Sequence, residues 1–495
     1  MLPMAFRSRP QTRFQAELPA LELEELARRY CWLRYIDTLG IYRGSPLALL
    51  GLAQGLRGSL GLGVASDRGA LVVGGVSPLE HLYRPRPASL SDAVAMGLLA
   101  HGQADAILGE LGFDGDLITQ VELLGEAVRL GLKLVVIAEA DDARGVDAAR
   151  SLGWRVEQLD GGDLLEGWNL GRALWHGLQD QATPVVVVFN GFADTFDIDE
   201  LGYLAPQTLD RFEREAIAAA SRLADDPRPD LARTAAKRRL AMTMTEFETE
   251  SVSELVTTLA TTLGAGSILV ATGVADRLRA LEHQQLVRLS DPRPLAEALL
   301  RWGGFPVVVT SKAPDRGTQM DAVIMTFDRD IRPGLTGIFV ESHEELTYFM
   351  GRLMGDAVPL THDYLVVGDQ LSRDGFGRVE NPTGRWLRPV SDLAVITWGR
   401  GVQVALRACT FLEESAGHVG VLELHQPGLV DEKLLAQAMT ARRICILYDG
   451  TPDVGYQLVT YLQEYFFSQL SAPVLLRSAR PGPGPIAVVL RGLLP

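Results

Sequence analysis

The stretch ADAILGELGFDGDLITQVELLGEAVRLGLKLVVIAEADDARG (104–145) contains two apolar strand patterns with a helix between them. ADAILGEL (104–111) and LKLVVIAEA (132–140) are short runs rich in β-branched residues, and the helix carries Gly125-Glu126-Ala127. Two apolar strands joined by a helix are typical of neighbouring parallel strands. The stretch therefore predicts an α/β fold.

The same pattern continues along the chain. Further strands are predicted at TPVVVVFNG (183–191), GSILVATG (266–273), FPVVVTS (305–311), DYLVVGD (363–369), DLAVITWG (392–399), HVGVLEL (418–424) and RRICILYDG (442–450). Near-continuous apolar strands that alternate with helices indicate doubly wound, mostly parallel sheets covered on both faces. One sheet could not hold all of them, so we expect three such domains.

Two breaks divide the chain. ADDPRPDLARTAAKRR (224–239) is polar and contains two prolines, which is typical of a linker. The stretch 369–386 is long, glycine-rich and without periodicity. We therefore predict domains at 1–223, 240–386 and 387–495, with a linker at 224–239.

Composition limits the classes of function. The 495 residues exceed what one hydrophobic core supports, and the net charge of −15 argues against nucleic acid as a partner. Three distant cysteines form neither a disulfide framework nor a zinc site. No leader and no apolar run of roughly 18 residues is present, so the expected location is the cytoplasm, with no membrane contact.

Common site motifs are absent, and the remaining candidates have plain explanations. There is no phosphate-loop, H-E-x-x-H or G-x-S-x-G pattern, and the eight histidines have no metal-ligand spacing. Gly399 and Gly401 form a partial G-x-G that could approach a phosphate, although a tight turn between strand and helix is the simpler interpretation. The acidic pairs Glu344-Glu345 and Glu413-Glu414 are expected on solvated helix faces.

Acidic residues follow both strands of the opening stretch. Gly115-Asp116 comes after the first strand and Asp141-Asp142 after the second. The carboxyl ends of parallel strands meet at the edge where open α/β sheets bind ligands. Carboxylate oxygens suit Mg²⁺, which in turn would hold a diphosphate.

This succession resembles the diphosphate-binding domain of thiamine-diphosphate enzymes of the transketolase family, which includes deoxyxylulose-phosphate synthase and the 2-oxoacid dehydrogenase first components. The family's G-D-G and E-A motifs correspond to Gly115-Asp116-Leu117 and Glu126-Ala127. LVRLSDPRPLAEALLRWGGFPVVV (286–309) is similar to its pyrimidine-binding domain, and 391–435 resembles its C-terminal domain. The resemblance implies those three domains in that order, a homodimer, and a site with thiamine diphosphate and Mg²⁺ in which Gly115, Asp116 and Asp142 bind cofactor and both aspartates hold the metal.

Several positions depart from the family. Asp142 stands where the metal site has a carboxamide, and Leu117 replaces the third motif glycine. No stacking aromatic occurs near Ala313-Pro314. Glu297 is the only candidate for the catalytic glutamate that protonates the cofactor, and its alternative is a plain helix-surface role.

Two functions follow from these observations. The first is a non-catalytic or diverged transketolase-family protein, in which the cofactors are lost and the scaffold has a structural, regulatory or complex-forming role, since the departures fall on residues that would touch the cofactor. The alternative is an active thiamine-diphosphate and Mg²⁺-dependent enzyme that makes or breaks a C–C bond next to a ketone. A third arrangement is a hetero-oligomer in which a protein partner supplies the lost residues.

Overall fold

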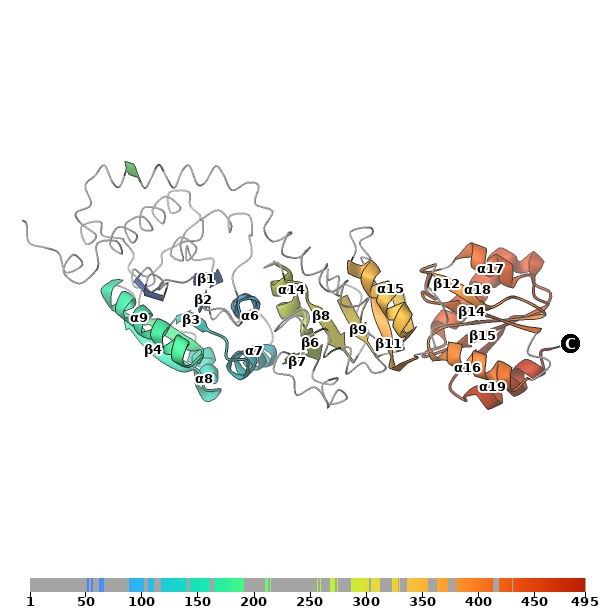
Figure 1. The fold of residues 1–495 in the computed structure, drawn as a ribbon, viewed down its shortest axis with the longest axis horizontal. Coiled ribbons are helices and arrows are strands. Elements are labelled where there is room, and N and C mark those ends of the chain that lie inside the picture. The colour runs from blue at the N-terminus through green and yellow to red at the C-terminus, as the bar shows by residue number, and fades with distance from the viewer. Residues whose placement is uncertain are drawn as a thin grey trace, which may run out of the picture. The chain divides into compact units, whose positions relative to one another are not determined.

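The described residues of the chain form three β-sheets in a computed structural model (Figure 1). The structure describes residues 51–52, 55–56, 62–65, 89–101, 106–110, 117–139, 143–160, 164–190, 210–211, 214, 256, 259, 268–271, 274, 286–301, 304–311, 323–327, 329, 336–354, 363–372, 379, 381–412, 418–429 and 431–494. The chain divides into two compact units, one containing the first sheet and the other the second and third sheets.

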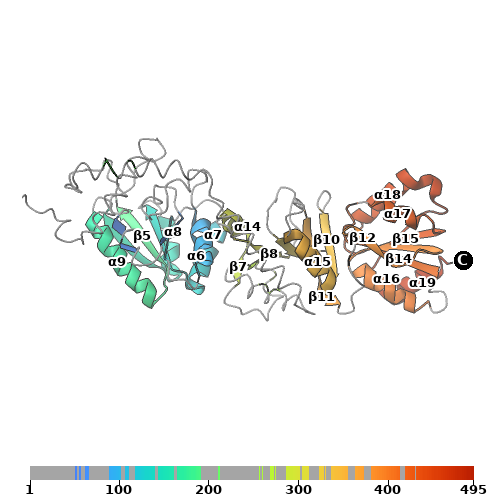
Figure 2. The ribbon, with the colours of Figure 1, turned by 45° about the horizontal axis from the view of Figure 1, so that its top comes forward.

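The first sheet is parallel throughout, in the order β1-β2-β3-β5-β4. Its strands are β1 (Leu62–Ala65), β2 (Ala106–Glu110), β3 (Leu134–Glu139), β4 (Arg155–Asp160) and β5 (Val185–Asn190). The helices that alternate with them are α6 (Leu90–Leu99), α7 (Leu117–Arg129), α8 (Ala143–Ser151) and α9 (Leu164–Asp180), seen around the strands in Figure 2. The apolar run of β5 is buried, as expected for a sheet covered on both faces.

A later helix packs against this first sheet's α6. Helix α14 (Arg293–Arg301) contacts α6, and the Arg301 guanidinium lies 2.8 Å from an Asp92 carboxylate oxygen. Asp92 also accepts the backbone N–H of Ser89, while the Ser89 hydroxyl accepts that of Asp92, a capping box that begins α6. Residues 289–303 therefore belong to the first compact unit.

The second sheet has the order β10-β11-β9-β8-β6-β7. Its strands are β6 (Ile268–Ala271), β7 (Val287–Leu289), β8 (Val307–Thr310), β9 (Val323–Thr326), β10 (Thr336–Ser342) and β11 (Asp363–Ser372). Every strand pair from β10 to β6 is parallel. Helix α15 (His343–Met354) follows β10 directly and packs on this sheet.

The third sheet has one antiparallel strand at its edge. Its order is β12-β14-β13-β15-β16, in which β12 is antiparallel to β14 and the other pairs are parallel. The strands are β12 (Gly384–Arg388), β13 (Leu393–Thr397), β14 (Val419–Leu424), β15 (Arg443–Tyr448) and β16 (Leu475–Ser478). Helices α17 (Glu432–Ala438) and α18 (Asp453–Phe466) cover one face, and α16 (Arg400–Thr410) and α19 (Pro483–Arg491) cover the other (Figure 1).

Alternate residues of the second sheet face two different cores. On β11, Leu365 and Val367 pack with α15, whereas Tyr364 and Val366 pack with residues of the third sheet. Phe339 of β10 packs there too. We call this cluster the shared core, and it consists of buried apolar residues contributed by both the second and the third sheet. Successive side chains of a strand point to opposite faces, so one strand can supply both cores.

The predicted α/β class with mostly parallel sheets is confirmed. Each of the nine predicted strands overlaps an observed one, and β11 extends three residues beyond the predicted end at 369. The strands that were not predicted are β1, β4, β7, β9, β10, β12 and β16. Six of them, all except β9, are edge strands, and β4 (RVEQLD) has the polar composition of an edge. The predicted domain boundaries stay predictions; the linker 224–239 lies outside the described residues, and β12 begins before the boundary expected at 387.

Among the described helices, none has both the length and the apolar character that crossing a bilayer requires.

Substitution of Gly401 tests the turn between β13 and α16. A Cβ at this position would lie 2.3 Å from the Thr397 hydroxyl oxygen, and that buried hydroxyl donates to the Leu447 carbonyl. We expect Gly401→Ala to lower the free energy of unfolding by about 1–3 kcal/mol through overpacking. Gly484→Ala is the matched control, because a Cβ there meets nothing within 4 Å. Urea unfolding measures both, and equal stabilities would contradict the prediction.

Candidate functional site

The residues expected to hold diphosphate and metal lie outside the described part of the chain. These are Gly115, Asp116 and Asp142. The neighbouring elements have the expected order, because β2 and β3 are adjacent parallel strands and lead along the chain to α7 and α8. Their assignment to a cofactor and metal site therefore stays a prediction.

The described part of the same motif has structural contacts. Glu126 is buried on α7, and both its carboxylate oxygens accept hydrogen bonds from the Arg129 guanidinium, at 2.9 and 2.5 Å. Ala127 is fully buried. Leu117, which stands at the position of the third motif glycine, is the first residue of α7 and is 55% exposed.

Glu297 lies on the exposed face of α14. Its electrostatic partner is Arg293, one helical turn earlier and also exposed. Leu295, Ala296 and Ala298 form the buried face of the helix. Glu297 is the one predicted site residue within the described part of the chain, and its catalytic role stays a prediction.

A different group of ionisable side chains is buried in the second compact unit. Glu345 is completely buried, which corrects the expectation that the pair Glu344-Glu345 is solvated; Glu344 is exposed as expected. The Glu345 carboxylate accepts hydrogen bonds from the backbone N–H groups of Glu341 (2.8 Å) and Ser342 (3.2 Å). The Ser342 hydroxyl accepts one from the N–H of Glu345. This capping box turns Glu345 back over the start of α15 instead of toward solvent.

Arg385 joins Glu345 to a second buried carboxylate, that of Glu423. Arg385 on β12 and Glu423 on β14 are partners in the strand register, and Arg385 Nε donates to Glu423 Oε2 at 2.8 Å. Arg385 Nη2 donates to Glu345 Oε1 at 2.6 Å. One guanidinium therefore connects the third sheet to the helix that follows β10, through charge-assisted hydrogen bonds.

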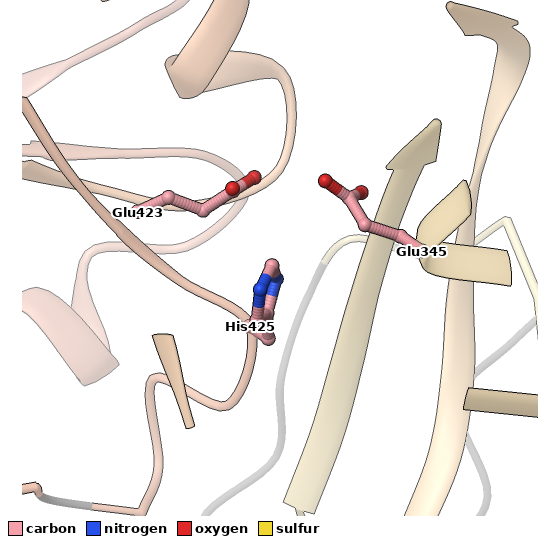
Figure 3. Close-up of side chains that lie close together, drawn as sticks. All are labelled: Glu345, Glu423 and His425. Atoms are coloured by element: carbon pink, nitrogen blue, oxygen red, sulfur yellow. The ribbon is translucent and has the colours of Figure 1, made fainter. Parts of the chain in front are cut away.

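His425 follows β14 and lies beside these carboxylates. Its backbone N–H donates to the Thr383 carbonyl and its own carbonyl accepts the N–H of Phe339. The side chain is completely buried, and neither ring nitrogen has a hydrogen-bond partner in the described part of the chain. Figure 3 shows the carboxyl groups of Glu423 and Glu345 pointing toward one another, with the His425 imidazole next to them.

Burial decides the protonation of this group. It raises the pKa of Glu423 to about 8, with further increases from the negative charges of Glu345 and Glu341 and a partial decrease from Arg385. Burial also raises the pKa of Glu345. For His425, burial and then the charge of Arg385 lower the pKa to about 3, so the imidazole is neutral. The three ligand atoms lie within 4.8 Å of one another, an arrangement that can share a proton or hold a cation.

The G-x-G turn accommodates a side chain of the protein. Gly399 has a φ of +54°, and a Cβ there would lie 2.8 Å from Asp449 Oδ2. That oxygen accepts the N–H of Arg400 at the start of α16 (2.9 Å), and Asp449 also forms an ion pair with Arg329. An aspartate thus occupies the place where a helix N-terminus could receive a phosphate, which supports the interpretation as a turn.

Sequence reasoning missed Glu345, Glu423, His425 and Arg385. The pattern Ser342-x-x-Glu345 is a capping-box signal, and Glu423 is an acid inside the apolar run VGVLEL. Both signals mark single residues. Their meeting with Arg385 depends on the pairing of β12 with β14 and on the packing of α15, which no local pattern encodes.

Loss of Arg385 should leave two buried carboxylates without their cation. We expect Arg385→Met to lower the free energy of unfolding by about 3–5 kcal/mol. Adding Glu423→Gln to that variant should restore part of the loss at a pH above about 8, where Glu423 is ionised, because the uncompensated charge is removed. Urea unfolding in metal-free buffer measures the single and double variants; a double variant less stable than Arg385→Met would contradict this account.

The raised pKa of Glu423 predicts a pH dependence of stability. The folded chain holds this proton more tightly than the unfolded chain, where the pKa is near its ordinary value of 4.5. The contribution of this proton to the free energy of unfolding is complete below the pKa of the unfolded chain. It is lost as the pH rises through about 8, where the folded chain releases the proton. As the pH rises from about 4.5 to above 8, we expect the free energy of unfolding of the native protein to fall relative to that of Glu423→Gln. Urea unfolding at successive pH values measures the difference, and parallel curves would count against it.

Comparison with known proteins identifies the third sheet and its helices. Residues 383–494 match the family model of the transketolase C-terminal domain. No curated protein matches the sequence.

Solved structures similar to the chain include transketolases from three organisms. That of Campylobacter jejuni has 11% identity and a TM-score of 0.48, covering 96% of this chain and 98% of the other. That of Leishmania mexicana has 12% identity and a TM-score of 0.47, covering 96% of each chain. That of Pichia stipitis has 11% identity and a TM-score of 0.46, covering 95% and 96%. The resemblance expected from the sequence is confirmed at residues 383–494, which match the transketolase C-terminal domain.

Proposed function

We propose that this transketolase-like protein is a non-catalytic or functionally diverged homologue with a structural, regulatory or complex-forming role. The observation that carries the proposal is the setting of Glu297, the only candidate for the glutamate that would protonate the cofactor. It lies on an exposed helix face, one turn from Arg293.

A general acid needs a setting that favours its protonated form. Enzymes provide this by enclosing the carboxyl group in an apolar site or beside another negative charge. Glu297 has solvent and a guanidinium as its surroundings instead. These are the surroundings of a surface carboxylate. They support a role for Glu297 as a solvated residue of α14 that pairs with Arg293.

The start of α7 also fits a diphosphate poorly. The first two residues of this helix, Leu117 and Ile118, are 55% and 61% exposed. A helix N-terminus receives phosphates through its N–H groups when glycine allows close approach. Two large apolar side chains at that position favour contact with another apolar surface, which supports a complex-forming role.

The alternative is an active thiamine-diphosphate enzyme, alone as a homodimer or completed by a partner subunit. The arrangement of β2 and β3 favours it, because they are adjacent parallel strands and Asp116 and Asp142 follow them in the sequence. Mg²⁺ held by these aspartates would anchor the diphosphate, and the cofactor would supply the carbanion chemistry.

Calorimetric titration with thiamine diphosphate and Mg²⁺ separates the two functions. For the proposed role we expect no heat and no thermal stabilisation at about millimolar cofactor, a concentration at which a ligand with micromolar affinity stabilises strongly. Micromolar binding that Asp116→Ala abolishes would overturn the proposal and assign the metal site to Asp116. Ketose phosphates and 2-oxoacids would then be the first substrates to test.

A further inference from the structure

We propose that Glu345, Glu423 and His425 form a buried binding site for one divalent transition-metal ion of the Zn²⁺ class. The site lies where the third sheet meets the helix that follows β10. Its role is to hold these two parts together. The proposal does not depend on thiamine-diphosphate chemistry.

The ligand atoms of the three side chains lie almost close enough together to bind one metal ion. One ligand atom from each lies within 4.8 Å of the others. Two atoms bound to one zinc ion at about 2.1 Å lie at most about 4.2 Å apart. Small rotations of the two glutamates would therefore bring all three atoms onto one ion, and Figure 3 shows their carboxyl groups already directed toward each other.

The charges of the cluster favour a cation. Glu345 and Glu423 share a single guanidinium, that of Arg385, so two buried carboxyl groups bind one positive group, and a metal ion would displace the proton that burial favours on Glu423. Glu341, which is paired with the Arg329 guanidinium at 3.3 Å, adds a third carboxylate that acts on Glu423. Unpaired buried charge is costly, and a metal ion is one of the few groups that can compensate it inside a protein.

Arg385 and a metal ion can bind the same carboxylates. Each carboxylate has two oxygens and about four lone-pair sites. Arg385 uses one oxygen of each, Oε2 of Glu423 and Oε1 of Glu345. The guanidinium then orients the ligands from one side, as outer hydrogen bonds do in established metal sites.

His425 provides the observation that is independent of the acidic cluster. Its side chain is completely buried, yet both ring nitrogens lack a hydrogen-bond partner among the described residues. A buried polar atom without a partner is rare because it loses its hydrogen bonds to water. A neutral imidazole nitrogen is a good metal ligand, and coordination would satisfy it.

The ligand types select the metal. Two carboxylate oxygens with one imidazole nitrogen suit Zn²⁺ and similar transition metals, whereas Mg²⁺ prefers oxygen ligands and retains its water. The three side chains are buried, with exposed fractions of 0% for Glu345, 2% for Glu423 and 0% for His425. A water molecule or the second oxygen of one glutamate would complete the four-coordinate shell. The burial of all three side chains keeps substrates away, which fits an ion that stabilises the fold.

Zinc titration of the full-length protein tests the site. The protein is stripped with a chelator, then titrated with Zn²⁺ by calorimetry, with thermal unfolding as a second readout. His425→Gln removes the buried ligand, and His418→Gln is the matched control, because His418 is exposed and its Nδ1 lies 2.6 Å from an Asp392 oxygen. Mg²⁺ serves as the control ion.

We expect one high-affinity Zn²⁺ per chain and a thermal midpoint that rises with zinc. The affinity should fall more than about tenfold in His425→Gln, since even outer-sphere changes cost 10- to 100-fold, and should be unchanged in His418→Gln. Absence of saturable binding, or equal affinities in the two variants, would overturn the proposal. If His425→Gln does not fold, Glu423→Gln and X-ray absorption of the zinc-loaded native protein decide, because a spectrum without imidazole scattering would also overturn it.

Discussion

The second compact unit depends on one guanidinium placed between two buried carboxylates. Arg385 pairs with Glu423 across β12 and β14 and with Glu345 at the start of α15. The same unit contains the shared core, to which Phe339 and Tyr364 contribute from the second sheet. Apolar burial supplies most of the stability of such an arrangement, whereas the ion pairs require one relative position of the two sheets, because a displaced carboxylate would be buried without a partner.

The third sheet combines a family fold with local features of its own. Its glycine turn at Gly399 admits the Asp449 carboxylate to the start of α16, so the helix N-terminus is satisfied by the protein itself. Cys409 on α16 and Cys445 on β15 are buried in one apolar core. Burial raises the pKa of the Cys445 thiol to about 12, so this cysteine acts as an apolar core residue.

Fold and chemistry are separate questions in this protein. The match to the transketolase C-terminal domain covers residues 383–494, while the residues predicted to hold a cofactor follow the strands of the first sheet. There the described surface is apolar at Leu117 and Ile118. The least expected polar group lies elsewhere, where Glu345, Glu423 and His425 are enclosed together. A metal ion there would stabilise the scaffold without taking part in a reaction.

The sequence by itself determined the α/β class, because strands such as β3, β5 and β13 are apolar runs whose burial follows from composition. It also contained the capping signal of Ser342 and Glu345, and the turn at Gly399, since both depend on neighbouring residues. Polar edge strands such as β4 were not predictable, because their strand state comes from pairing. Only the tertiary structure decided that Glu345 meets Arg385 and Glu423, since these residues are distant in sequence and are brought together by strand register and helix packing.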